Sequence, residues 1–175
     1  MHIRARINAR KIVLLYFYER YFLSEAAAHE QLFDDMDKIA KSLDDDQAIS
    51  SKEVQQRMES GYYSDLDEEI AYIVTQHFAQ FPADEIDYEY IRVMAPKFDL
   101  YKQEVQEKVD SVAVSFGYKD MDLIDRVVFV LWYMERKELA TPREIVLNEM
   151  IELAKRYGDE ASAKLINGIW HKLLS

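Results

Sequence analysis

The 175-residue sequence contains no cysteine, which excludes disulfides, thiolate metal sites and cysteine nucleophiles together. A chain without cysteine is typical of a reducing compartment, so we expect a cytoplasmic protein. Glycine and proline are also scarce, at four and three residues. Since these residues are the main breakers of regular helices, the composition predicts an all-α protein. The length fits one domain, 1–175, around one core.

Long apolar runs are missing too. The longest, Ile12–Tyr18, is far too short to cross a bilayer. No cleavage site of small residues follows it, although basic residues precede it. We therefore expect neither a membrane span nor a signal peptide.

The residues that catalysis requires do not gather into a set. The Asp44-Asp45-Asp46 triplet lacks the glycine and terminal glutamate of a calcium loop. There is no phosphate-binding loop and no glycine-rich dinucleotide turn. The four histidines are scattered, and none forms a Glu-x-x-His pair: His2, His29, His77 and His171. We expect no enzyme, no metal and no other cofactor.

Charge is abundant but unevenly distributed. The formal net charge of −11 argues against nucleic acid, because phosphates are repelled. Residues 1–23 nevertheless carry five bases and one acid, whereas residues 24–69 carry fourteen acids and four bases. Exposed charges are screened beyond about 8 Å at physiological salt, so the local sign can outweigh the total. The basic first segment therefore stays compatible with a phosphate ligand.

Hydrophobic periodicity predicts a first helix over 3–23, in which Ala5, Ala9, Ile12 and Tyr16 share one face. No acid occurs among the first 18 residues, and four bases lie on the flanks of that face: Arg4, Arg6, Arg10 and Lys11. One interpretation is a solvated helix end. The other is a surface that binds phosphates.

The middle of the chain gives weaker signals. Periodicity predicts helices over 24–43 and 66–81, with a linker at 43–53. Residues 112–116 alternate like a short strand. No partner strand is in view, so we interpret them as a helix end running into a stop at Gly117.

The C-terminal third, from about 120 to 175, carries the clearest helix signals. Thr141, Pro142 and Glu144 predict a capping box that starts one helix. Gly158 is expected to end that helix in the left-handed conformation, and Asp159 to open the last one.

Four motifs follow one another in this third: Ile124-Asp125-Arg126, Thr141-Pro142, "NEMIELAKRYG" from Asn148 and Glu149 to Gly158, and "SAKLINGIW" from Ser162 to Trp170. In this order and spacing they resemble the NusB family of bacterial transcription antitermination factors. The basic first helix, leading into Leu15-Tyr16 or Phe17-Tyr18, is similar to the family's as well. Residues 24–110 match no family motif.

The resemblance implies an all-α fold of two packed helical subdomains. It also implies binding of boxA-type single-stranded RNA together with NusE, a small-subunit ribosomal protein, in the transcription elongation complex. The bases of the first helix would hold phosphates. Lys164 and Leu165 stand where the family has a Lys-Phe pair in its RNA surface, and leucine has no ring on which a base could stack.

Two features of the resemblance concern glycine and acidic residues. The family places an Asn-Gly pair inside its last helix, although glycine there costs roughly 1 kcal/mol relative to alanine. We expect Gly168 to let a neighbouring helix approach and Asn167 to hydrogen-bond across the contact, with a direct ligand role as the alternative. The acidic segment 24–69 is expected either to be a solvated face or to steer a basic partner.

Three functions are therefore compared. The first is an RNA-binding antitermination or rRNA transcription factor, favoured by the basic first helix. The second is a NusB-like protein–protein module that has lost RNA binding, favoured by Leu165 and the acidic composition. The third is the NusB-like domain of an rRNA methyltransferase, which we do not expect because no catalytic domain follows in this sequence.

Overall fold

A computed structural model describes residues 3–28, 52, 56, 65–113 and 117–173, and every regular element in these ranges is helical. The predicted all-α class is confirmed. The predicted linker at 43–53 lies outside the described residues except for Lys52, which is helical. Residues 114–116 of the possible strand also lie outside them.

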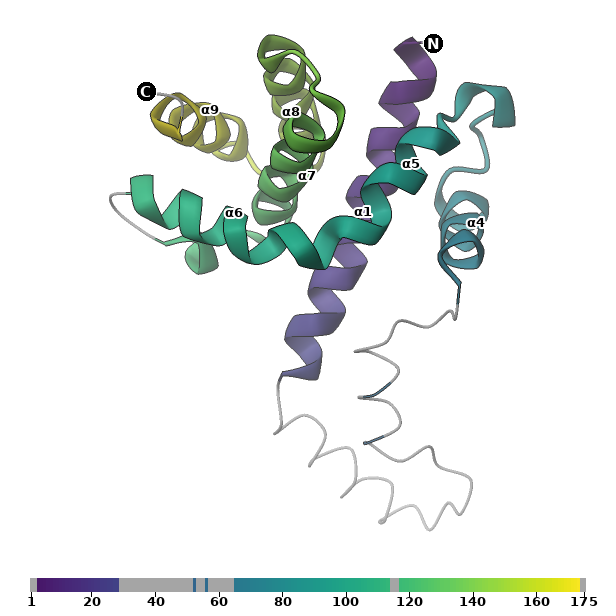
Figure 1. The fold of residues 1–175 in the computed structure, drawn as a ribbon, viewed down its shortest axis with the longest axis horizontal. Helices are drawn as coiled ribbons and strands as arrows, with labels where there is room; N and C mark the ends of the chain where they lie inside the picture. The colour runs from purple at the N-terminus through teal and green to yellow at the C-terminus, as the bar shows by residue number, and fades with distance from the viewer. Residues whose placement is uncertain (1–2, 29–51, 53–55, 57–64, 114–116, 174–175) are drawn as a thin grey trace.

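Helix α1 (Ile3–Ala27) is the long central element (Figure 1). It packs against α4 and α5 on one side and against α7 on the other, so it buries residues around much of its circumference. It continues past the predicted end at Leu23. Ser24 does not start a new helix but lies within α1, where its hydroxyl donates to the Tyr21 carbonyl, and residues 29–43 of the predicted second helix lie outside the described residues.

The described elements that come next after α1 are short. Helix α4 (Leu66–His77) begins where the carboxylate of Asp65 accepts from the amide of Asp67. It ends four residues before the predicted Phe81. Phe78 and Phe81 instead stack in the following turn, with ring centroids 5.0 Å apart. A 3₁₀ turn, η1 (Ala83–Glu85), leads to α5 (Tyr88–Met94).

A second 3₁₀ turn, η2 (Ala95–Lys97), joins α5 to α6 (Phe98–Val112), and η3 (Tyr118–Asp120) leads to α7 (Leu123–Leu139). Helix α6 ends before the predicted stop at Gly117, with Ala113 as its last cap. Helix α7 is buried almost all round because α1, α6 and α8 surround it.

The last two helices are α8 (Arg143–Tyr157) and α9 (Ser162–Leu173). The predicted capping box at Thr141 is wrong, because the residue that caps the helix is the next one along the chain. Pro142 caps α8, no side chain hydrogen-bonds to the first amides, and the Pro142 carbonyl accepts from Ile145 and Val146. Asp159 does open α9 as predicted, since its carboxylate accepts from the amides of Ala161 and Ser162.

Gly158 ends α8, but not in the predicted left-handed conformation. Its φ of −90° is open to any residue. The left-handed residue is Ala140, with φ 49°, in the turn between α7 and α8. Glycine is needed at 158 for a different reason: a Cβ would lie 2.4 Å from the Ser162 Oγ and 2.8 Å from the Ala154 carbonyl.

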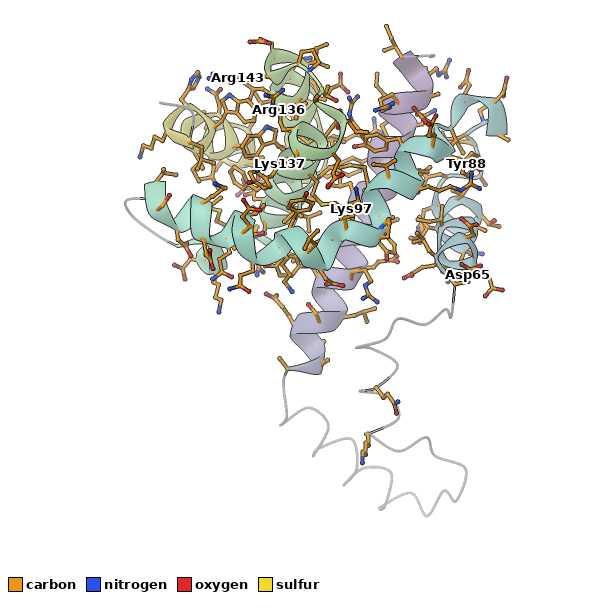
Figure 2. The ribbon with its side chains drawn as sticks, in the orientation of Figure 1. Asp65, Tyr88, Lys97, Arg136, Lys137 and Arg143 are labelled. Atoms are coloured by element: carbon orange, nitrogen blue, oxygen red, sulfur yellow. The ribbon has the colours of Figure 1, made fainter. Side chains whose placement is uncertain are left out.

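One hydrophobic core runs through the described part of the chain. Its largest fully buried side chains come from early, middle and late elements alike: Trp170, Tyr90, Tyr118, Phe17 and Phe129. Side chains fill the spaces that the ribbon leaves between helices (Figure 2). Helices α1 and α7 are central to this core, since α1 packs against α4, α5 and α7, and α7 packs against α1, α6 and α8.

Candidate nucleic-acid interface

Two of the four basic residues predicted to hold phosphates, Arg6 and Arg10, form ion pairs inside the protein instead. Arg10 is only 5 % exposed, and its guanidinium donates to both carboxylate oxygens of the fully buried Glu135 at 2.7 and 2.9 Å. A third contact, at 3.2 Å, joins it to Glu149. Burial opposes the charged form, yet these carboxylates together raise the pKa of Arg10. The predicted phosphate role of Arg10 is corrected on these grounds.

Arg6 is engaged in the same way. Its Nε donates to Asp87 at 2.8 Å, and its guanidinium lies 4.6 Å from the ring centroid of Tyr90. The side chains of Arg6 and Asp87 are both mostly buried, with exposures of 15 % and 11 %. Arg6 therefore ties α1 to α5 and does not point toward solvent as the helical periodicity had suggested.

The other two bases gather with a residue from α8. Lys11 lies close enough to Arg4 and Arg156 that, after burial, their charges lower the pKa of its ammonium. The side chain of Arg4 is 73 % exposed and pairs with Glu85 at 3.0 Å, a solvent-exposed contact of little energy. Lys11 and Arg156 have aromatic neighbours, Phe81 and Tyr157, and form no ion pair within the described ranges, although the charge of Glu149 partly balances that of Lys11. We call Arg4, Lys11 and Arg156 the cation cluster.

Two grooves open beside the cation cluster, and Lys11 lines both. The smaller, of about 330 Å³, holds charged side chains of α1 and α8, including Lys155, which pairs with Glu152 at 2.7 Å. The larger, of about 650 Å³, is mostly apolar and lies between α1, the start of α7 and the α8–α9 turn; we call it the apolar groove. Its lining is Lys11, Leu14, Leu15, Tyr18, Phe78, Asp122, Leu123, Ile124, Tyr157, Gly158 and Asp159.

The predicted residues of α9 separate into two groups. Lys164 is exposed, whereas Leu165 is partly buried and packs against the core. Leu165 therefore supports the fold and is withdrawn as a surface residue. Asn167 and Gly168 are exposed as well, and α9 continues through them without a break.

The expected close approach at Gly168 is wrong. A Cβ built there would meet nothing within 4 Å among the described residues. The glycine is therefore not a packing contact within this part of the chain, and it leaves a stretch of bare backbone on the α9 surface beside Lys164.

The remaining motif residues have structural positions. Asn148 is exposed on α8, and Glu149 helps to hold Arg10. The Thr141 carbonyl accepts from the guanidinium of Arg136. The Asp125-Arg126 motif is buried at the start of α7, where Arg126 pairs with Glu25 of α1 through both of its terminal nitrogens.

A second set of cations surrounds the end of α7 and the start of α8 (Figure 2). Arg136 donates to the Thr141 carbonyl, Lys137 lies over the ring of Tyr133, and Arg143 lies over that of Trp170. Each is fixed by a neutral neighbour. They supply a control of the same charge for tests of the cation cluster.

Sequence reasoning missed Arg156, Tyr18, Tyr157 and Asp122 as surface-site residues. Arg156 lies in the last turn of α8, where its charge also suits the helix dipole. Its proximity to Lys11 follows from the packing of both α1 and α8 against α7, which no local pattern encodes. No helix in the described ranges is long and apolar enough to span a membrane, and no group of metal-ligating side chains occurs in them.

The sequence is similar to one protein family and to individual proteins that carry a name. A family model described as the NusB family matches residues 47–175. The chain is similar to the transcription antitermination protein NusB of Anaeromyxobacter dehalogenans strain 2CP-1, with 33% identity over 75 residues, 43% of this chain and 53% of that protein. The protein of the same name from Methylacidiphilum infernorum is 28% identical over 96 residues, 53% of this chain and 66% of that protein.

A third relative, transcription antitermination protein NusB of Clostridium botulinum strain Kyoto, is 30% identical over 91 residues, 51% of this chain and 64% of that protein. The chain thus spans between about half and two thirds of the length of these relatives. The matched part includes α4 to α9 but not the basic first helix.

Proposed function

This chain belongs to the NusB family, and from that membership we propose that it is a transcription antitermination factor that binds boxA-type single-stranded RNA together with NusE. The ribosomal protein and the transcription elongation complex are its proposed partners. We propose no enzymatic activity.

The observation that carries the RNA part of the proposal is the cation cluster. Burial and the like charges of Arg156 and Arg4 lower the pKa of Lys11, with Glu149 opposing them, so an anion bound beside these cations would be favoured. Lys11 and Arg156 form no ion pair in the described ranges, although Glu149 partly balances the charge of Lys11, so both cations are available to a phosphate. This support does not depend on Arg6 and Arg10, which are occupied by ion pairs within the protein.

Helix α9 supplies a second part of the proposed RNA surface. Lys164 keeps the family's lysine and is exposed. The bare backbone at Gly168 costs helix stability without any packing gain in the described structure. A ligand that approaches the backbone closely would account for it, so the direct ligand role of Asn167 and Gly168 is the one we retain.

The test is fluorescence anisotropy with single-stranded RNA over a range of salt concentrations. Neutralising about three phosphates predicts a slope of log K against log salt near −2. The double variant Lys11→Gln/Arg156→Gln should bind more weakly and reduce that slope. Its matched control is Lys137→Gln/Arg143→Gln, which removes the same charges at the other cation set and should leave the slope unchanged.

The alternative function, a protein–protein module without RNA binding, is favoured by two observations. Arg6 and Arg10 are occupied by carboxylates, and Leu165 is packed against the core. A slope near zero for the wild-type protein would select this alternative. Retained capture of NusE in that case would identify the surviving partner.

A further inference from the structure

We propose that the apolar groove accepts one guanine base of the single-stranded RNA whose phosphates bind the cation cluster. The inference rests on the proposed RNA binding and adds base selectivity to it. Four observations support it: the groove's shape, its aromatic rims, its continuity with the cation cluster, and the chemistry of its two carboxylates.

The shape and lining suit a flat, mostly apolar group. The groove has a volume of about 650 Å³, within the usual range for small-molecule pockets. Leucine and isoleucine side chains from α1 and α7 form its walls, with Phe78 from the turn after α4. Burying a charged phosphate against such walls would cost much hydration free energy, whereas burying the apolar face of a base would cost little.

Two exposed aromatic residues lie at the rims. Tyr18 of α1 is 37 % exposed and Tyr157 of α8 is 40 % exposed, and both line the groove. Single-stranded RNA is commonly held by bases that leave the stack and lie against aromatic rings. These tyrosines therefore offer the stacking surface that Leu165 cannot provide.

The groove is continuous with the cation cluster through Lys11, which lines both the apolar groove and the charged groove beside it. A nucleotide whose phosphate contacts the cluster would carry its base in the direction of the apolar groove. Lys11 and Arg156 both line that charged groove, and their cations favour an anionic backbone beside the apolar groove.

The lining of the groove also includes two carboxylates, Asp122 and Asp159. Asp122 precedes α7, but its side chain caps no amide and has no ion-pair partner in the described ranges. Asp159 uses one oxygen, Oδ1, for the amides that open α9. A carboxylate only accepts hydrogen bonds, so the base that fits must present donors.

Guanine meets this requirement better than the other bases. Its Watson–Crick edge carries the N1–H and N2–H₂ donors side by side, which can satisfy both oxygens of one carboxylate. Uracil places its single N–H between two carbonyls, and cytosine and adenine place an acceptor nitrogen beside their amine. A carboxylate repels those acceptors, so Asp122 selects for guanine.

The experiment compares labelled RNAs of about twelve nucleotides by fluorescence anisotropy. One is oligouridine, and the others carry a single guanosine, inosine or cytidine at the centre. We expect the guanosine RNA to bind about tenfold tighter than oligouridine, the range for a good bidentate base contact. Inosine lacks the N2 amine and should fall between them, and this arm requires no protein variant.

The protein arm uses Asp122→Asn, which should abolish the guanosine preference, measured as the ratio of the affinities for the guanosine RNA and for oligouridine. Asp84→Asn, an exposed carboxylate in η1, is the matched control and should keep the preference. Arg4→Gln/Arg156→Gln should weaken the binding of every RNA by the same factor, because it changes phosphate contacts alone.

Equal affinity for guanosine and uridine RNAs, with the salt dependence intact, would overturn the guanine inference and leave the proposed RNA binding in place; the groove would then be assigned to a protein partner. A preference for guanosine that survives in Asp122→Asn would also overturn it. Failure to bind any of the RNAs would overturn the proposed function together with this inference.

Discussion

Arg10 of α1 and Glu135 of α7 form a buried, two-pronged ion pair at the centre of the molecule, with N···O distances of 2.7 and 2.9 Å. The hydroxyl of Tyr90, from α5, donates to the same carboxylate at 2.9 Å. Three helices therefore meet at one carboxyl group that has no exposure to solvent. A base that the sequence places in a phosphate-binding set is in fact part of the core.

The first prediction concerns this pair. Glu135→Gln leaves Arg10 buried with only Glu149 to balance its charge, so we expect the free energy of unfolding to fall by about 3–5 kcal/mol. Urea unfolding measures the loss. Arg4→Gln, at the exposed pair with Glu85, should cost less than about 1 kcal/mol. An equal effect of the two substitutions would contradict the buried location.

The second prediction compares two glycines. Gly168→Ala should stabilise the protein by up to about 1 kcal/mol, because it improves helix propensity and its Cβ meets nothing. Gly158→Ala should destabilise by about 1–3 kcal/mol, because its Cβ would overlap Ser162 and the Ala154 carbonyl. Thermal unfolding of the two variants tests both signs. A destabilised Gly168→Ala would restore the packing role that the structure argues against.

The third prediction concerns Asp125, at the buried start of α7. Burial raises its pKa above the ordinary 3.8, the carboxylates of Asp122 and Asp159 add to that effect, and a hydrogen bond from Ser162 opposes it. The folded protein therefore holds this proton more tightly than the unfolded chain does. This group accordingly adds stability as the pH falls from above its raised pKa toward 3.8, and the gain is lost as the pH rises.

Asp125→Asn removes the charged form. Its free energy of unfolding relative to the wild type should therefore be highest near neutral pH and should decline toward about pH 4. Urea unfolding at several pH values checks the trend, with Asp84→Asn as the exposed control. A relative stability that increases as the pH falls would give the opposite sign and refute the assignment.

The fourth prediction concerns the acidic segment 24–69. Three of its described surface acids, Asp65, Asp67 and Glu68, lie at the start of α4. Figure 2 shows Asp65 on the other side of the view from Arg136 and Arg143. Asp44, Asp45 and Asp46 lie outside the described residues. If the segment steers a basic partner, stopped-flow association with NusE should slow as salt rises.

Changing Asp44, Asp45 and Asp46 to Asn should lower that association rate several-fold at low salt and have little effect on dissociation. The control removes three exposed acids from other elements: Asp84, Glu89 and Glu107. Should the rate respond equally to both sets, net charge alone would explain it. Should it respond to neither, the acidic segment would be a solvated face.

The sequence predicted the fold class and the late helices well because their signals are local. The apolar periodicity of α7 and the carboxylate of Asp159 at the start of α9 depend on neighbouring residues only. Gly158 was identified as a helix end for the wrong reason. Its requirement comes from Ser162, one turn ahead, and not from its own backbone angles.

The candidate site was predicted less well because it depends on contacts between distant segments. Arg6 and Arg10 have the spacing of a basic helix face, but their partners Asp87, Glu135 and Glu149 come from 81 to 139 residues further along the chain. Lys11 and Arg156 were both visible in the sequence, and only the packing of α1 and α8 against α7 makes them neighbours.

The chain has two tryptophans, Trp132 of α7 and Trp170 of α9, and they pack edge to face with ring centroids 4.3 Å apart. Both are almost fully buried, so intrinsic fluorescence emission from this protein reports one location, the contact between α7 and α9. A red shift on heating would record the parting of those two helices. Circular dichroism at 222 nm averages over every helix instead. Coincident transitions from the two signals would show that α1 and its ion pairs unfold together with the C-terminal helices, whereas an earlier loss of ellipticity would reveal that the N-terminal elements separate first.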